Sequence, residues 1–207
     1  MPSQLGADTW VLSLKFSPLF DPLHPFFVDV GAFHGEHLSN THLLEQHGYS
    51  GICIDANPNV ASFASRPNSK LVTALMDSED GLQKEFIFSA SPELNGIRDY
   101  LAGYHKQGVL NSIRKADSMT TRSLASILDE HHAPRYIHYL TLDIEGAEYE
   151  VLKTFPFDRY TFGALTIEHN GVEPKRSQIR TLLEQHGYIY HKEVKWDDWY
   201  IYHHQGV

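Results

Sequence analysis

The chain has 207 residues, of which 42% are hydrophobic and 21% are charged. This length is typical of one domain, and the composition indicates a folded globular protein rather than a disordered or collagen-like chain. Lys and Arg total 17 against 26 Asp and Glu, which gives a net charge of −9 with histidine neutral. Because proteins that bind the phosphate backbone normally present a basic face, this balance argues against nucleic acid as the main partner.

The cysteine content and the lack of long apolar runs restrict the cellular compartment that we expect for the protein. A single cysteine, Cys53, excludes an internal disulfide and a cysteine-based zinc cluster, and its apolar neighbours predict a buried thiol. No apolar run approaches the ~20 residues that span a bilayer. The amino terminus also lacks the basic and then apolar pattern of a signal peptide. We therefore predict a cytoplasmic protein with no membrane partner.

The first half of the chain alternates short apolar runs with glycine and proline. The first 25 residues contain four prolines, so we expect an N-terminal arm over 1–25 and one domain over 26–207. Residues 26–30 form a β-favouring apolar run, as in a strand buried on both faces. Further along the chain we predict a helix at 36–47, a strand at 49–55, a short helix at 57–65, and strands at 70–76 and 84–89.

The second half opens with the least regular stretch of the sequence, residues 90–118. A connection of this length inside a domain is usually functional or mobile. Beyond it we predict helices at 122–131, 145–154 and 175–186, strands at 136–143 and 161–168, and two closing strands at 188–194 and 199–203. We expect the closing segment 196–200, which contains two tryptophans, to pack at the sheet edge rather than to bind a ligand.

This alternation of strands and helices predicts a Rossmann-like α/β sandwich, with a mostly parallel sheet and helices on both faces. The last two strands have no helix between them, so one of them is expected to join the edge of the sheet antiparallel. In such sheets ligands bind at the carboxyl ends of the strands.

The first of these ends carries a glycine-rich turn, VDVGAFHGE at 28–36. Dinucleotide folds use G-x-G-x-x-G, whose second glycine admits the pyrophosphate, whereas Phe33 would crowd a pyrophosphate here. S-adenosylmethionine has no pyrophosphate and suits this turn. Asp55, after the second strand, is placed to accept hydrogen bonds from ribose hydroxyls. The predicted cofactor residues are Asp29, Gly31, Ala32, His34, Gly35, Asp55, Ala56 and Asp143.

Three motifs together resemble the FkbM family of S-adenosylmethionine-dependent methyltransferases: the turn at 28–36, IDANP at 54–58 and especially LDIEGAEYEVL at 142–152. The resemblance covers roughly residues 26–190. It implies a class I methyltransferase fold and, usually, O-methylation of sugar or natural-product hydroxyls. It also implies that Asp55 binds ribose and that Asp77 lies near adenine. One departure is Ala56-Asn57, where relatives often have Glu-Pro after the strand.

The chemistry is expected at the ends of the fourth and fifth core strands. Methyl transfer requires an acceptor that is positioned and deprotonated, so acidic and imidazole groups are the candidates. We predict Asp143, Glu145, Glu168 and His169 as the residues of the reaction. Two alternatives for activating the acceptor stay open. Asp143, Glu168 and Asn170 offer oxygen ligands for Mg²⁺ or Mn²⁺, and His169 offers a general base.

Two other functions use the same fold class. A nicotinamide-dependent oxidoreductase is disfavoured by Phe33, and a catalytically silent module that keeps the cofactor site is the second alternative. A small-molecule acceptor is the expected partner of the enzyme. The sequence does not identify that acceptor or the oligomeric state.

Overall fold

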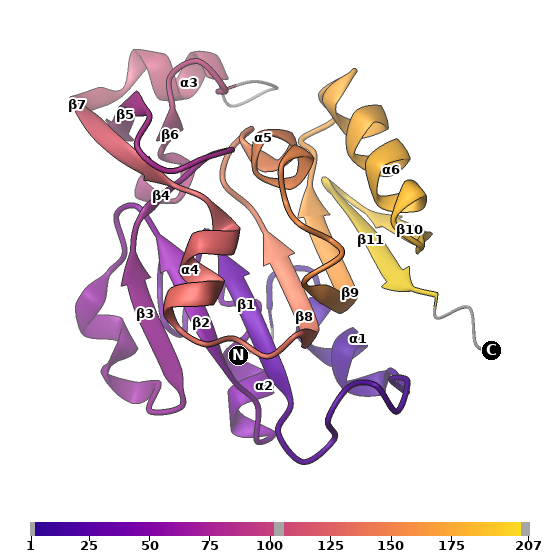
Figure 1. Ribbon diagram of the computed structural model, residues 1–207. Helices are drawn as coiled ribbons and strands as arrows, with labels where there is room; N and C mark the ends of the chain where they lie inside the picture. Colours follow the sequence, from indigo (N-terminus) through magenta and orange to yellow (C-terminus); the bar gives the residue numbers. More distant parts are fainter. Residues whose placement is uncertain (1–2, 102–105, 204–207) are drawn as a thin grey trace.

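The computed structural model describes residues 3–101 and 106–203. Within them the chain forms a large sheet with helices on both faces and a smaller sheet at one end (Figure 1). The large sheet has seven strands in the order β10-β11-β9-β8-β1-β2-β3. These strands are β1 (Phe26–Val30), β2 (Ser50–Asp55), β3 (Ser69–Thr73), β8 (Tyr136–Leu142), β9 (Thr161–Glu168), β10 (Tyr188–Val194) and β11 (Asp197–Tyr202).

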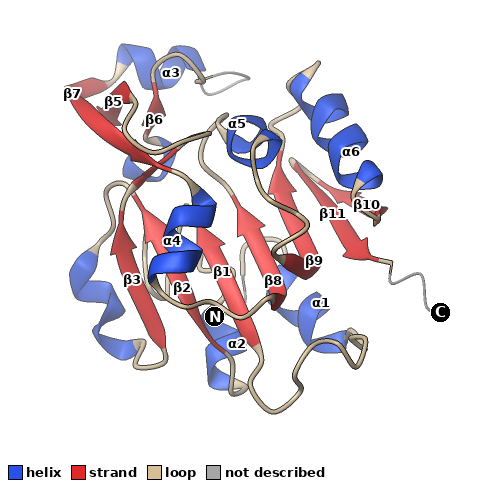
Figure 2. Ribbon diagram, in the orientation of Figure 1, coloured by secondary structure: helices blue, strands red, loops and turns tan. Residues whose placement is uncertain are grey.

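The strand directions confirm the Rossmann-like α/β sandwich. β1, β2, β3, β8 and β9 pair in parallel, while β11 is antiparallel to both of its neighbours, β9 and β10 (Figure 2). The antiparallel strand therefore lies one position in from the edge. The hairpin that joins β10 to β11 folds back so that β11, rather than β10, contacts β9.

Alternate residues of the strands supply two cores. Phe27 packs with α1 (Ala7–Ser13), α2 (His42–Gln46) and the 3₁₀ helix η1 (Val60–Ser65). Its neighbour Val28 points to the other face and packs with α4 (Leu124–Glu130), α5 (Glu148–Lys153) and α6 (Lys175–Gln185). Cys53 is buried as predicted. None of the helices in the described ranges is long and apolar enough to cross a membrane.

The smaller sheet corrects the prediction of an irregular stretch at 90–118. Its strands are β4 (Leu75–Met76), β5 (Gln83–Ser89), β6 (Gly96–Ile97) and β7 (Ile113–Arg122), in the order β4-β7-β5-β6. The 3₁₀ helix η2 (Pro92–Leu94) and α3 (Lys106–Asn111) connect them. Most of β7 is exposed, so its sequence lacks the apolar alternation that reveals a half-buried strand.

Three predicted boundaries are wrong for identifiable reasons. The helix expected at 36–47 is shortened to α2, and the helix expected at 145–154 begins at Glu148. Left-handed backbone at Glu145 and Gly146 prevents an earlier start. The strand expected at 70–76 divides at Ala74, because β3 joins the large sheet and β4 joins the smaller one.

The segment before β1 packs against the large sheet. Both carboxylate oxygens of Asp8 accept hydrogen bonds from Ser3, from its backbone N at 2.7 Å and its hydroxyl at 2.9 Å. The Trp10 ring stacks on His191 at 5.6 Å and lies 4.6 Å from the Trp199 ring. These contacts hold α1 on the β10–β11 hairpin. The domain boundary at residue 25 stays a prediction.

His138 in β8 gives the fold a pH dependence. Its ring is 3% exposed, lies among Phe16, Phe20 and Tyr49, and accepts a hydrogen bond from the Phe26 backbone N at 3.2 Å. Burial lowers its pKa to about 4. Below pH ~6.5 the His138 side chain binds a proton in the unfolded chain but not in the folded protein. The free energy of unfolding therefore falls as the pH drops towards 4.

We expect His138 to remove about 2 kcal/mol of unfolding free energy between pH 7 and pH 5. Urea denaturation at both pH values measures the change. His138→Gln keeps a hydrogen-bond acceptor without the titration, so the pH-dependent loss should be smaller in the variant by that amount. Equal losses in the two proteins would contradict this prediction.

Candidate active site

A cavity of about 360 Å³ lies where the carboxyl ends of the parallel strands meet the smaller sheet. This is the end at which ligands bind in open α/β sheets. Most of the residues singled out from the sequence line this cavity: Asp29, Gly31, Ala32, Asp55, Ala56, Asp143, Glu145, Glu168 and Asn170. The predicted residues that do not line it are His34, Gly35, Asp77 and His169.

Gly31 brings the ends of β1 and β8 together. Its φ is +90°, and a Cβ at this position would lie 1.7 Å from the backbone oxygen of Asp143. The missing side chain of Gly31 therefore allows the end of β8 to approach closely, in addition to leaving room in the cavity that Gly31 lines. Gly35 has a comparable packing role, because its Cβ would lie 2.4 Å from the backbone oxygen of Ser62 in η1.

Gly31→Ala is expected to lower the unfolding free energy by about 3 kcal/mol, since neither strand end can retreat without breaking the parallel ladder. Urea denaturation provides the measurement. Gly81→Ala is the matched control, because Gly81 has the same φ of +90° but open space around its Cβ. Its cost should be about 1–2 kcal/mol, the price of the left-handed backbone alone. Equal losses in the two variants would rule out the close approach as the cause.

Asp55, the last residue of β2, links the turn that follows β1 to the turn that follows β2. One carboxylate oxygen accepts a hydrogen bond from the Phe33 backbone N at 2.9 Å, and the other accepts from the Asn57 backbone N at 2.6 Å. Burial raises the pKa of Asp55. A carboxylate has about four lone-pair sites, so two stay available to hydroxyl donors in the cavity. This geometry suits the ribose contact predicted for Asp55.

Asp29 is 3% exposed at the base of the cavity. It accepts a hydrogen bond from the Thr41 hydroxyl at 2.6 Å, and burial raises its pKa to about 6. Near it, the Asn40 amide donates to the Thr141 hydroxyl at 3.1 Å. A buried carboxylate in this position is suited to a cationic group such as an ammonium.

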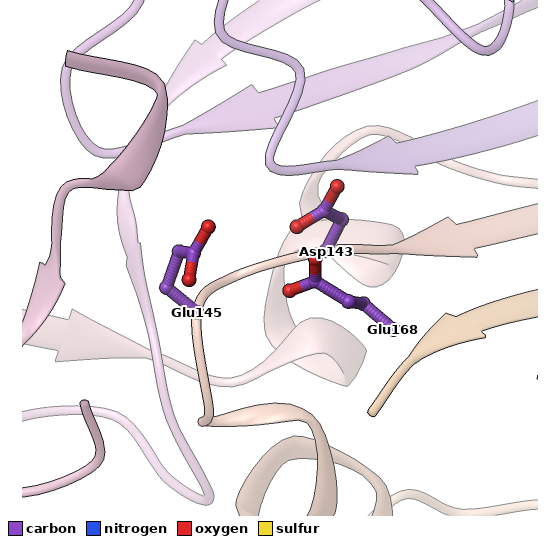
Figure 3. A group of neighbouring side chains, drawn as sticks. All are labelled: Asp143, Glu145 and Glu168. Carbon is purple, nitrogen blue, oxygen red and sulfur yellow. The ribbon is translucent and has the colours of Figure 1, made fainter. Parts of the chain in front are cut away.

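Asp143, Glu145 and Glu168 form what we call the acidic cluster. They come from the segment after β8 and the end of β9, and one carboxylate oxygen of each lies within 4.8 Å of the others (Figure 3). Burial and the neighbouring carboxylates raise the pKa of Glu145 to about 9 and raise that of Glu168 well above its usual range. At neutral pH the three carboxyl groups therefore repel one another when they are all ionised.

Asn170 donates from its amide nitrogen to the acidic cluster, at 2.8 Å to Glu168 and 3.5 Å to Glu145. Its amide oxygen would have to exchange places with the nitrogen to act as a metal ligand. His169 lies outside the cavity. Its Nδ1 accepts from the Gly171 backbone N at 2.9 Å, and its buried Nε2 is 3.7 Å from Asp198. This arrangement supports a positioning role for His169 rather than contact with an acceptor.

The side chains of His34 and Asp77 form hydrogen bonds outside the cavity. The Nδ1 of His34 accepts hydrogen bonds from the backbone N of Glu36 and of His37, each at 3.1 Å. Asp77 is 1% exposed and accepts from the Tyr100 hydroxyl at 3.1 Å. Its carboxylate also accepts from the Ser78 backbone N at 2.6 Å, and these contacts keep Asp77 out of the cavity lining, although Leu75 and Met76 of β4 belong to that lining.

Sequence reasoning missed two kinds of residue. Apolar side chains line the cavity beside Asp55 and are suited to an aromatic base: Ala74, Leu75, Met76, Phe86 and Ile97. Buried carboxyls also lie behind the acidic cluster. Glu148 accepts from the backbone N of Ile144 and of Gly146, each at 3.0 Å, and burial raises its pKa to about 7. The repeated acids of 142–152 were the available signal for Glu148.

Asp197 is the second missed carboxyl. It is 9% exposed and sits opposite Glu168 in the register of β11 and β9. Burial and the charges of Asp143 and Glu148 raise its pKa to about 8. The acidic cluster, with this fourth carboxyl beside it, fits a hard divalent cation, because oxygen donors are what Mg²⁺ and Mn²⁺ prefer.

The comparison with protein families agrees with this geometry. The family model described as the methyltransferase FkbM domain matches residues 29–190. No curated protein is similar enough to match the chain. The matched range contains the glycine turn, Asp55 and the whole acidic cluster. The chain belongs to the FkbM methyltransferase family.

Proposed function

We propose that the protein transfers the methyl group of S-adenosylmethionine to a hydroxyl oxygen of a sugar or natural-product-type small molecule. The observation that carries this proposal is the convergence of the Gly31 turn, Asp55 and the acidic cluster on one cavity. The apolar residues around Leu75 and Met76 suit the adenine, Asp55 suits the ribose, and Asp29 suits the ammonium group.

The acidic cluster suits the reacting end. The sulfonium is already a good leaving group, so the enzyme has to position the acceptor and take up or share its proton. Burial and mutual repulsion raise the pKa values of Glu145 and Glu168, so whichever of the two is ionised is the protein group suited to accept that proton.

We further propose Mg²⁺ or Mn²⁺ at Asp143, Glu145 and Glu168, with Asn170 beside them. The grounds are the donor set of three converging carboxylates and the buried Asp197, which pairs with Glu168 in the register of β11 and β9. When bound, the cation would lower the pKa of an acceptor hydroxyl.

The proposal extends to partners and location. The acceptor is a small molecule, nucleic acid and membranes take no part, and the protein works in the cytoplasm. A net charge of −9 supports the exclusion of nucleic acid.

Transfer of labelled methyl from S-adenosylmethionine to a panel of hydroxylated acceptors tests the proposed function. Mass spectrometry and NMR of the product should show the labelled methyl group bonded to an oxygen, as an ether. EDTA should abolish turnover, and added Mg²⁺ or Mn²⁺ should restore it.

Other outcomes separate the parts of this proposal. Label on nitrogen or carbon would contradict O-methylation. Full turnover in EDTA would exclude the cation and leave the carboxylates as the bases. Tight cofactor binding with no transfer to any acceptor would favour the catalytically silent module.

A further inference from the structure

Two cavity residues lie outside the range shared with the family. Gln4 comes from the segment before α1, and Trp196 comes from the turn between β10 and β11. Neither lies within residues 29–190, which contain the glycine turn and the acidic cluster. The packing prediction for 196–200 is confirmed for the buried Trp199 and Tyr200, whereas Trp196 lines the cavity.

The structure ties the Trp196 segment to the reacting end of the cavity and anchors the Gln4 segment through Ser3. The Trp196 backbone oxygen accepts hydrogen bonds from the backbone N of His169 at 2.8 Å and of Asn170 at 3.3 Å. These two residues directly follow Glu168, so Trp196 borders the acidic cluster. Gln4 is held beside Ser3, whose hydrogen bonds to Asp8 anchor the segment.

The two flanking segments also hold each other. The ring of Trp10 in α1 stacks on His191 of β10 and contacts Trp199 of β11. One packed unit, formed from both sides of the family range, therefore borders the cavity.

The charge of the cavity limits what can bind there. Its described lining contains the carboxyls Asp29, Asp55, Glu93, Asp143, Glu145 and Glu168, and within the described ranges no Lys or Arg lines it. Lys195 lies over the Trp196 ring, with its Nζ 5.0 Å from the ring centroid, but does not line the cavity. Away from the proposed cation site, an anionic acceptor group would therefore be desolvated among carboxylates with no Lys or Arg of the described lining to pair with it. An indole face and amide groups instead suit an uncharged ring that carries hydroxyls.

We propose that Trp196 and Gln4 determine acceptor specificity, with Trp196 stacking on an uncharged hydroxylated ring and Gln4 hydrogen-bonding to it. This inference rests on the proposed function, because it concerns the acceptor side of the same cavity. The family range holds the cofactor and the acidic cluster, and the flanking unit selects the acceptor.

Saturation-transfer NMR on the complex with S-adenosylhomocysteine provides the test. The neutral probes are methyl β-D-glucopyranoside, methyl α-L-fucopyranoside and methyl α-L-rhamnopyranoside. Methyl β-D-glucuronoside and glucose 1-phosphate are their anionic counterparts. Neutral glycosides should receive saturation and the anionic ones should not.

Variants assign the contact. Trp196→Ala should weaken binding of the neutral probe about tenfold, the value of one lost aromatic contact, whereas Trp196→Phe should keep most of it. Gln4→Ala should weaken it less. Ile189→Ala is the control, since Ile189 is exposed on the same hairpin and does not line the cavity. S-adenosylhomocysteine affinity, measured by calorimetry, should be unchanged in all four variants.

The inference is overturned if the anionic probes bind as well as the neutral ones, if no glycoside binds, or if Trp196→Ala leaves glycoside binding unchanged. A folded wild-type protein that fails to bind S-adenosylhomocysteine would instead remove the proposed function, and this inference with it.

Discussion

Glu168→Gln is expected to lower methyl transfer at least about 100-fold, the effect of removing a proton-transfer group, and at the same time to stabilise the protein. Glu168 is buried against Asp143 and Glu145, and burial with their charges raises its pKa well above the usual range. An uncharged amide keeps the shape and removes the repulsion. The gain in unfolding free energy at pH 7 should be about 1–2 kcal/mol, typical of relieving a strained functional site.

The pH dependence identifies the cause of this stabilisation. A raised carboxyl pKa means that the folded protein holds a proton that the unfolded chain releases, so wild-type stability is lost as the pH rises above ~4.5. In EDTA, the advantage of Glu168→Gln should therefore shrink at pH 5 and grow towards pH 8. Glu184→Gln, at an exposed position of α6, is the control and should change neither stability nor turnover. A Glu168→Gln protein that is less stable at pH 8 would contradict this account of the acidic cluster.

Arg66→Met is expected to cost about 3–5 kcal/mol of unfolding free energy, the usual loss when one partner of a buried ion pair is removed. Arg66 is 2% exposed and pairs with Glu45. Its guanidinium also donates to the Gly35 backbone oxygen at 2.7 Å and to the Thr41 hydroxyl at 3.0 Å. Urea denaturation measures the loss.

The same variant should weaken cofactor binding, because Thr41 in turn donates to Asp29 at the base of the cavity. The double variant Arg66→Met with Glu45→Leu leaves no unpaired buried charge and should recover much of the stability. It should not recover cofactor affinity, since the Thr41 contact is still missing. Recovery of both properties would show that Arg66 has no part in placing Asp29.

The ends of the main strands could be predicted from the sequence because each combines a continuous apolar run with a polar stop. Asp55, Asp143 and Glu168 follow or end such runs, and Asp29 lies one residue before the end of another. The parallel topology brings all four to one cavity. The glycine turn could be predicted in the same way, because it directly follows the first apolar run. These patterns are local, and the parallel order of the strands then determines that their ends meet at one site.

The remaining features depend on contacts between distant segments. Asp77 does not line the cavity because its buried carboxylate accepts from the Tyr100 hydroxyl, a contact between residues 23 positions apart in the chain. His169 is turned away from the cavity by its hydrogen bond to Gly171. Trp196 and Gln4 line the cavity from two segments that pack on each other through Trp10 of α1 and the β10–β11 hairpin, and neither segment encodes that contact by itself.

Calorimetric titration of S-adenosylmethionine into the purified protein tests the central claim most directly, with NAD as the comparison ligand. Asp55→Asn is the matched variant, because it keeps the side-chain shape and replaces one hydrogen-bond acceptor. We predict micromolar binding of S-adenosylmethionine, markedly weaker binding in Asp55→Asn and no heat with NAD. Binding of NAD, or no binding of S-adenosylmethionine and S-adenosylhomocysteine to a folded protein, would contradict the assignment of this cavity.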